Sequence, residues 1–297
     1  MILAADIGGT KSLLALFEGA APAFELRLAS AEFADFESLL ARFLDEARTA
    51  LGAAPAIEAA CLGVAGPVRG GIVRVTNLPW TIDAARLAGR FALGSLELMN
   101  DFAAAAWGVG ALAPQDLVTL QAGAPLAGAP RAVLGAGTGF GVAYVVNGVP
   151  VPGEGGHGGF APAGVEQEAL WRFLHERLGR VQVEDVVSGP GLARIHEFMT
   201  GERVAPEDAA PAALDLFVTC FGAAAGDHAL NVMARGGVYV CGGIASKVLP
   251  RLAAGGFLAA FNDKGAFAEH TRRMPVHVVT NERVALLGAA AAAARGG

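Results

Sequence analysis

A short turn rich in glycine and threonine lies close to the start of the chain. It reads Asp6-Ile7-Gly8-Gly9-Thr10-Lys11. Glycine lets backbone N–H groups approach an anion closely, so these residues could form a phosphate nest. Thr10 adds a hydroxyl donor, and Asp6 could hold Mg²⁺ through water. The alternative is an ordinary hairpin turn whose glycines serve geometry alone.

A second turn of the same kind, Gly135-Ala136-Gly137-Thr138-Gly139, follows in the middle of the chain. Short apolar runs enter and leave both turns, which predicts strand–turn–strand in each case. The dinucleotide fingerprint and the Walker A loop both open a helix, so neither fits. Two such turns could clamp one phosphate chain from both sides, which favours a phosphotransferase or an ATPase.

Asn100-Asp101 stands between a predicted strand and a predicted helix. Asp is a good helix N-cap, and a capping role for Asp101 needs no catalysis. Alternatively, Asp101 lies at the carboxyl end of a sheet strand, where open α/β sheets bind ligands, and accepts a proton as a general base. Asn100 could orient a polyol with its amide donor and acceptor.

Glu154 and His157 share a glycine-rich loop, residues 152–162. A carboxylate and an imidazole three residues apart could bind adjacent sugar hydroxyls, hold a metal, or simply be solvated. Because no other His or Cys lies close in sequence, hydroxyl binding is favoured over metal. Glu184 is a weaker candidate, since a surface helix carboxylate explains it equally well.

Strands alternate with helices along most of the chain, which predicts an α/β fold with layered sheets. Helices are expected at 36–51, capped by Asp35, and up to residue 91, capped by Asp83; Ser246 is expected to cap a later one. Both halves begin with a hairpin around a phosphate-type turn. This indicates two related domains with a cleft between them.

Composition narrows the class of protein. The chain has 297 residues, 54% hydrophobic and 17% charged, which suits one large or two medium globular domains. A net charge of −6 argues against a general nucleic-acid surface. The scattered cysteines Cys61, Cys220 and Cys241 make a disulfide framework improbable and favour a cytoplasmic setting. No signal peptide or bilayer-length apolar run is expected, and hence no membrane partner.

Taken together, these segments resemble bacterial glucokinase, of the hexokinase group within the sugar-kinase/actin/heat-shock-chaperone superfamily. The resemblance covers nearly the whole chain in family order. The matching segments are 6–10, 100–102, 134–139, 153–157 with 160–162, 188–192 and 242–244.

The resemblance implies a two-domain actin-like ATPase (ribonuclease H-like) fold with an interdomain cleft. A small domain would span 1–110 and regain the C-terminal helix 284–297, and a large domain would span 111–283. The implied reaction is ATP- and Mg²⁺-dependent phosphorylation of the glucose 6-hydroxyl, the first step of glycolysis, by an enzyme that is commonly a homodimer.

The resemblance also implies roles for individual residues. Asp101 would be the catalytic base and would contact glucose with four other side chains, those of Asn100, Glu154, His157 and Glu184. The first turn would hold ATP through Asp6, Gly8, Gly9, Thr10 and Lys11. The second turn would hold it through Gly137 and Thr138. Gly242 and Gly243 would border the adenosine.

Two departures from related sugar kinases stand out. The ROK kinases place a cysteine-rich zinc motif after a similar Glu-Gly-His segment, whereas this chain has no cysteine between Cys61 and Cys220. Lys11 stands where several relatives have Asn. A kinase for mannose or N-acetylglucosamine, a different phosphoryl donor, and a non-catalytic sugar sensor remain as alternatives.

Overall fold

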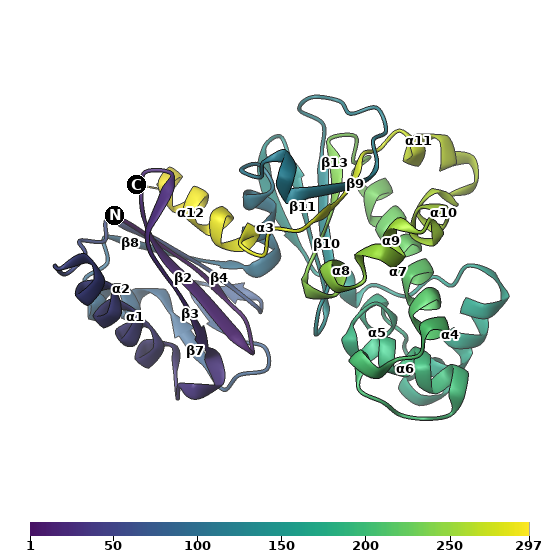
Figure 1. The fold of residues 1–297 in the computed structure, drawn as a ribbon, viewed down its shortest axis with the longest axis horizontal. Coiled ribbons are helices and arrows are strands. Elements are labelled where there is room, and N and C mark those ends of the chain that lie inside the picture. The colour runs from purple at the N-terminus through teal and green to yellow at the C-terminus, as the bar shows by residue number, and fades with distance from the viewer. Residues whose placement is uncertain (297) are drawn as a thin grey trace. The chain divides into compact units, whose positions relative to one another are not determined.

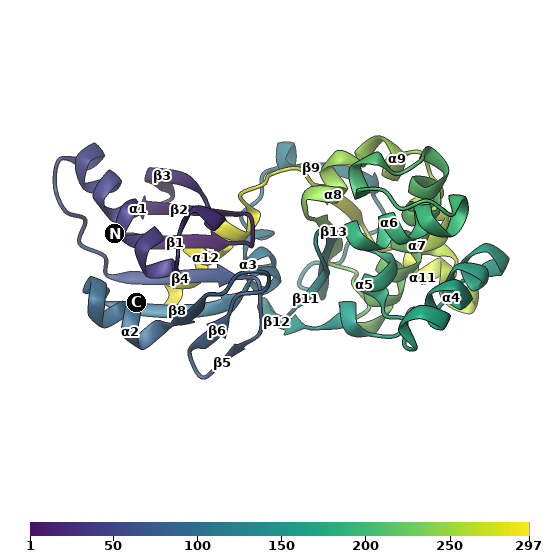
Figure 2. The same cartoon turned by 90° about the horizontal axis from the view of Figure 1, so that it is seen from below.

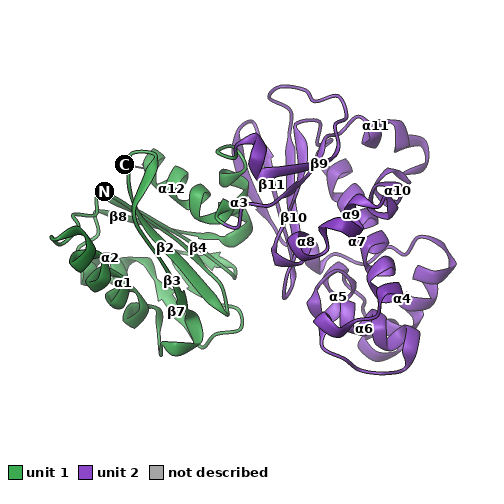
Figure 3. Cartoon of the chain, viewed as in Figure 1, with its two compact units in different colours: residues 1–112, 283–297 green, residues 113–282 purple. Residues whose placement is uncertain are grey.

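The computed structural model describes residues 1–296, which fold as two compact units. Unit 1 comprises residues 1–112 and the C-terminal segment from residue 283, and unit 2 comprises residues 113–282 (Figure 3). The sequence places the corresponding domain boundaries at residues 110 and 284.

Unit 1 is built on a five-stranded sheet of order β3-β2-β1-β4-β8 (Figure 1). The first three strands pair antiparallel, whereas β1, β4 and β8 run parallel. A separate three-stranded sheet contains β5, β6 and β7. The strands are β1 (Ile2–Ile7), β2 (Lys11–Glu18), β3 (Ala21–Ala29), β4 (Ala59–Val64), β5 (Val68–Arg69), β6 (Ile72–Arg74), β7 (Thr81–Asp83) and β8 (Ser95–Asn100).

Helices cover both faces of the five-stranded sheet. They are α1 (Phe36–Leu51), α2 (Ala84–Phe91), α3 (Asp101–Gly108) and α12 (Val284–Gly296). The predicted caps are confirmed, since Asp35 accepts from the Ser38 amide and Asp83 from the Arg86 amide. Apolar side chains of α1 join the core with Leu3, Ala5 and Ile7 of β1. α12 packs against α3, β1 and β4, and Figure 1 draws it beside α3.

Unit 2 contains a six-stranded sheet of order β12-β11-β10-β13-β14-β9. Strands β10, β11 and β12 pair antiparallel in sequence, β13 and β14 continue parallel to β10, and β9 closes the edge antiparallel to β14. The strands are β9 (Leu117–Gln121), β10 (Arg131–Ala136), β11 (Phe140–Val146), β12 (Val149–Gly153), β13 (Gly237–Cys241) and β14 (Val276–Val279).

The helices of unit 2 lie on one side of its six-stranded sheet, as the second view shows (Figure 2). They are α4 (Gly164–Leu178), α5 (Val183–Val186), α6 (Gly189–Thr200), α7 (Pro211–Asn231), α8 (Gly243–Lys247), α9 (Leu249–Ala253), α10 (Gly256–Asn262) and α11 (Ala268–Arg272). The long helix α7 is buried by packing against α10 and the sheet. The expectation that Ser246 caps a helix is wrong, because Ser246 lies inside α8.

The two sheets repeat one topology. Each contains three antiparallel strands joined in sequence, with two later strands parallel to the first and beside it. The unit 2 sheet has in addition β9, which precedes these strands in the chain and pairs with β14 at the edge. The first hairpin of each sheet carries one of the two glycine/threonine turns, between β1 and β2 and between β10 and β11. Within residues 1–296, no helix is both long enough and apolar enough to cross a bilayer.

Candidate functional site

The first glycine turn joins β1 to β2, and hydrogen bonds within the turn and from Ser30 hold its backbone in place. The Gly8 amide donates to the carbonyl oxygen of Lys11 at 3.1 Å, which closes the hairpin. The buried Ser30 hydroxyl donates to the Gly8 carbonyl oxygen at 2.8 Å, and the Ser30 amide donates to that of Thr10 at 3.0 Å. Thr10 and Lys11 are exposed. The turn is therefore fixed at its base, while the side chains proposed for phosphate point to solvent.

The parallel strands of unit 1 end together at this turn. Ile7 pairs with Val64, and Val64 pairs with Asn100 on β8. The sheet therefore brings the end of β1 and the Asn100-Asp101 pair to one edge, as expected for ligand sites of open α/β sheets.

The helix cap at this edge is Asn100, and Asp101 is the first residue of α3. The Oδ1 atom of Asn100 accepts from the amides of Phe102 at 2.9 Å and Ala103 at 3.3 Å. The alternative in which Asp101 is the N-cap is therefore wrong. Asp101 Oδ1 also accepts from the Phe102 amide at 2.9 Å. Because capping occupies the Asn100 oxygen, this residue would address a ligand with its amide NH₂ rather than with both groups.

Asp6 lies on the face of the sheet that α3 covers. Register pairs Asp6 with Gly63, and a Cβ added to Gly63 would lie 2.9 Å from the Cβ of Ala104 in α3. Burial raises the pKa of Asp6 to about 6, although the charge of Arg27 opposes the rise. A desolvated carboxylate regains stabilisation from a hard cation or its waters, so the residue fits the predicted contact with Mg²⁺.

In unit 2 the structure brings Glu154, His157 and Glu184 together. The Nδ1 atom of His157 lies 3.6 Å from Oε1 of Glu184, and its Nε2 atom lies 3.9 Å from Oε2 of Glu154. The side chains of Glu154 and His157 are more than half exposed, and that of Glu184 is 33% exposed. Polar groups of this kind, open to solvent and facing one another, suit a polyhydroxylated ligand.

Gln182 completes this cluster, and sequence reasoning missed it. Its Oε1 atom lies 2.8 Å from Nδ1 of His157. With Oε1 of Gln182 as the acceptor in this pair, Nδ1 is the donor, and Nε2 of a neutral ring would then be an acceptor. Arg180 also donates to the backbone carbonyl of His157 at 3.2 Å. No motif marks either residue, because their contacts with His157 span more than twenty positions of sequence.

Glu184 connects this cluster to the second glycine turn. Its Oε2 atom accepts from the Phe140 amide at 3.1 Å, directly after Gly139. The Gly137 amide donates to the Gly139 carbonyl at 2.9 Å, and the Gly189 amide donates to that of Gly137 at 2.8 Å. The alternative that Glu184 is only a surface helix carboxylate is wrong, because it also anchors the turn.

Gly137 has no steric need to be glycine within the described fold. A Cβ placed there would meet nothing within 4 Å, whereas one on Gly135 would lie 2.2 Å from the carbonyl oxygen of Cys241. Gly135 is thus required by strand packing, while Gly137 leaves open space in front of its backbone. Close approach of a ligand to the backbone gives a physical reason for a glycine at such a position.

Gly242 and Gly243 lie where β13 passes into α8, next to the second turn. Gly242 has a φ of 93°, and an added Cβ would lie 2.7 Å from the carbonyl oxygen of Ala136. A Cβ on Gly243 would meet nothing within 4 Å. Because β13 pairs with β10 in parallel, both glycine segments lie at one end of the unit 2 sheet.

Among the described residues, no group of three or more His, Cys, Asp or Glu side chains is arranged to hold a metal ion. Unit 1 carries a glycine turn and a carboxylate at a helix start, and unit 2 carries a glycine turn and a polar cluster around an imidazole. These are the parts that phosphoryl transfer to an alcohol requires.

Solved structures with the same arrangement of strands and helices define the class. A crystal structure of glucokinase from an Antarctic psychrotroph is 30% identical, with a TM-score of 0.87 and coverage of 99% of this chain and 98% of that one. Glucokinase from Balamuthia mandrillaris, crystallised in complex with glucose, gives a TM-score of 0.82 at 21% identity, covering 99% and 93%. The fold is that of the two-domain actin-like sugar kinases.

Sequence comparison narrows the class to one family. The model of the Glucokinase family matches residues 3–296. Glucokinase from Synechocystis sp. strain PCC 6803 is 36% identical, in an alignment that covers 99% of this chain and 98% of the relative. The chain belongs to the glucokinase family, which confirms the resemblance inferred from its motifs.

Proposed function

We propose that this protein transfers the γ-phosphoryl group of ATP to the 6-hydroxyl of D-glucose. Family membership over the full chain supports this activity. The observation that carries it is the contact of Glu184 with both His157 and the backbone of the second glycine turn. One side chain thereby connects a sugar-binding cluster to a phosphate-binding turn.

The residue roles follow from the chemistry of each group. Glu154, His157 and Glu184 bind glucose hydroxyls, with His157 held by Gln182. Asn100 adds its amide NH₂, and Asp101 accepts the proton of the 6-hydroxyl as that oxygen attacks phosphorus. In this proposal residues of both units take part in glucose phosphorylation, and exclusion of water from the reacting groups would limit wasteful ATP hydrolysis.

The nucleotide is held by backbone and small side chains. Gly8, Gly9, Thr10 and Lys11 meet the phosphates from unit 1, and Gly137 and Thr138 meet them from unit 2. Gly242 and Gly243 border the adenosine. Phosphoryl transfer depends mainly on positioning and on stabilising charge on the phosphate oxygens. When bound, Mg²⁺ would offset part of the negative charge on those oxygens, and Asp6 is the residue that would hold its water shell.

We further propose a cytoplasmic homodimer that supplies glucose 6-phosphate at the entry to glycolysis. The three cysteines are free and buried, and burial raises the pKa of each thiol to about 12, which suits reduced, inert side chains. Light scattering on the purified protein measures the oligomeric state directly.

A sugar panel with ATP tests the activity. We expect ADP release, coupled to NADH oxidation, to show the highest kcat/KM with glucose and lower values with mannose and N-acetylglucosamine. Chelation of Mg²⁺ should abolish turnover, and readdition should restore it. A protein that binds glucose but releases no ADP would instead be a sensor, and preference for another hexose would reassign the substrate.

A further inference from the structure

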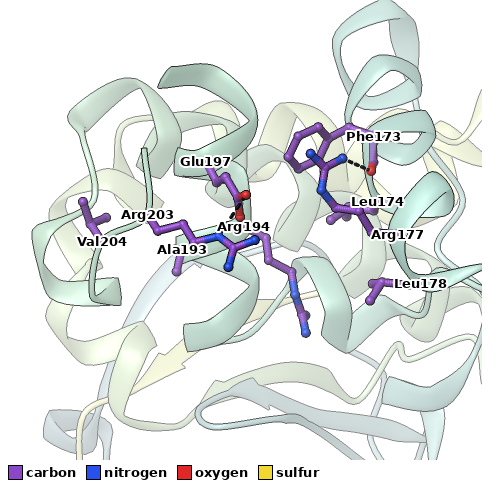
Figure 4. A pocket seen from close by; sticks show the side chains of 9 residues that line it. All are labelled: Phe173, Leu174, Arg177, Leu178, Ala193, Arg194, Glu197, Arg203 and Val204. Carbon is purple, nitrogen blue, oxygen red and sulfur yellow. Dashed lines mark hydrogen bonds and ion pairs between the residues drawn. The ribbon is translucent and has the colours of Figure 1, made fainter. Parts of the chain in front are cut away.

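Unit 2 contains a cavity of about 460 Å³ between α4, α6 and the segment that follows α6 (Figure 4). This volume lies within the range of small-ligand sites. None of the residues proposed above for glucose, ATP or Mg²⁺ lines it. The cavity therefore needs an explanation of its own.

Three arginines line the cavity, namely Arg177, Arg194 and Arg203, together with a single carboxylate, Glu197. Such a concentration of positive charge is unexpected in a chain with a net charge of −6. Glu197 pairs with Arg203 at 3.1 Å, and Asp185, from outside the lining, pairs with Arg194 at 3.1 Å. The three arginines therefore still outnumber the two carboxylates that pair with them.

Each guanidinium keeps donors available for a ligand. Arg177 lies 3.6 Å above the ring of Phe173 and donates Nη1 to the Phe173 carbonyl, as Figure 4 shows. Arg203 donates its Nε to Glu197, and Arg194 uses its Nη1 for Asp185. A guanidinium has five N–H donors, so most of the donors on these three side chains bind no other group among the described residues.

The rest of the lining is apolar. It includes the buried Leu174 and the side chains of Phe173, Leu178 and Val204. Arginine favours phosphate and carboxylate through paired hydrogen bonds, and an apolar wall favours a hydrocarbon or aromatic portion of the same ligand. The combination fits a small organic phosphate better than a bare inorganic ion.

Arg194 also connects the cavity to the polar cluster around His157. It donates to both the backbone and the side-chain oxygen of Asp185, each at 3.1 Å. The other carboxylate oxygen of Asp185 accepts from the backbone amide of Gln182 at 2.9 Å, and the side chain of Gln182 binds His157. An anion that drew Arg194 away from Asp185 would therefore disturb the segment that orients His157.

We infer that this cavity is an effector site for a small organic phosphate, and that its occupancy reaches His157 through Arg194, Asp185 and Gln182. The inference does not depend on the proposed activity, because both of its tests are binding measurements on the purified protein.

Calorimetry with phenyl phosphate, inorganic phosphate and phenol separates the contribution of the arginines, which bind the phosphate, from that of the apolar wall, which binds the ring. Saturating non-hydrolysable ATP analogue and glucose are included to occupy the proposed catalytic site. We expect one phenyl phosphate per chain, bound at least about tenfold more tightly than either fragment. Replacing Arg177 and Arg203 by Gln should weaken the binding of phenyl phosphate roughly tenfold or more, because charge-assisted hydrogen bonds to the phosphate are lost. The matched control is Arg172→Gln, since Arg172 lies on α4, is exposed and pairs only with Glu168 among the described residues.

Imidazole NMR tests the connection to His157. Phenyl phosphate should shift the ring resonances of His157 in the parent protein and in Arg172→Gln, but not in the Arg177→Gln/Arg203→Gln variant. His157→Gln assigns the resonance. Absence of saturable binding, equal affinity in the double variant, or unshifted His157 signals at saturation would each overturn the inference.

Discussion

Asp101 is the residue whose proposed role makes the strongest chemical prediction. Asn100, not Asp101, supplies the principal cap of α3, so neutralising Asp101 leaves the helix start in place. We expect Asp101→Asn to lower kcat roughly 10²–10⁴-fold, the usual contribution of a general base. Glucose affinity, measured by fluorescence or calorimetry, should change by less than about threefold, because asparagine keeps the size and polarity of Asp101 and the four other proposed hydroxyl-binding residues are retained.

Asp45→Asn is the matched control, because Asp45 is an exposed carboxylate on α1 that makes an ion pair with Arg48. Its kinetics should equal those of the parent. Near-normal turnover in Asp101→Asn would remove Asp101 from the role of base.

A substitution at Gly137 tests whether the phosphates of ATP approach the backbone of the second glycine turn. An added methyl group meets nothing within 4 Å, so Gly137→Ala should keep the thermal midpoint of the parent. If phosphate approaches this backbone, the methyl group should raise the KM for ATP roughly tenfold, by loss of about one charge-assisted hydrogen bond. Thermal unfolding and ATP kinetics on one preparation provide both readouts.

Gly135→Ala provides the opposite case, because its methyl group would lie 2.2 Å from the Cys241 carbonyl oxygen. Overpacking of this kind costs about 1–3 kcal/mol or more, so this variant should lose stability. An unchanged KM for ATP in Gly137→Ala would argue that phosphate does not approach this backbone.

At the scale of elements, the loop from Glu154 to Phe160 positions the sugar cluster by close packing against β11. A Cβ on Gly156 would lie 2.1 Å from the carbonyl oxygen of Phe140, whereas one on exposed Gly159 would meet nothing within 4 Å. Gly156→Ala must therefore displace the short helical turn that carries His157. We expect kcat/KM for glucose to fall about 10²-fold, as for a misplacement of about 1 Å in a binding group.

Gly159→Ala should retain kcat/KM within about twofold, since it alters the same loop without a clash. Steady-state kinetics over a glucose series measures both variants. Equal activity of the two alanine variants would mean that the position of this loop does not control glucose use.

At the scale of the whole molecule, the C-terminal helix α12 packs closely against α3. A Cβ on Gly288 of α12 would lie 1.7 Å from the Ala104 carbonyl oxygen of α3, and one on Gly108 would lie 1.8 Å from that of Val284. Glycines on both helices thus allow their backbones to approach closely. Since α3 begins at Asp101, the packing of α12 helps to fix the helix that carries a residue proposed for catalysis.

Gly288→Ala should destabilise unit 1 by about 1–3 kcal/mol or more, through forced separation of the two helices. Gly89→Ala is the matched control, because Gly89 is an exposed interior residue of α2 with nothing within 4 Å of an added Cβ. It should stabilise by about 0.5–1 kcal/mol, the helix preference of alanine over glycine. Denaturant unfolding measures both, and a Gly288→Ala protein as stable as the parent would contradict the packing argument.

The sequence alone determined the features that depend on neighbouring residues. Both glycine turns, the caps Asp35 and Asp83 and strand β13 follow from hydrogen bonds and periodicity within a few positions, so they can be read directly. The motifs also identified Glu154, His157 and Glu184 as candidates. Their local chemistry set what each group could do but left open whether they would meet.

Only the tertiary structure decided what depends on distant segments. It placed Glu184 against the second turn, added Gln182 to His157, gave the α3 cap to Asn100 and set β9 beside β14. It also brought three arginines around one cavity. The physical reason is that burial and strand pairing join residues far apart in sequence, and these contacts leave no periodic pattern in either partner.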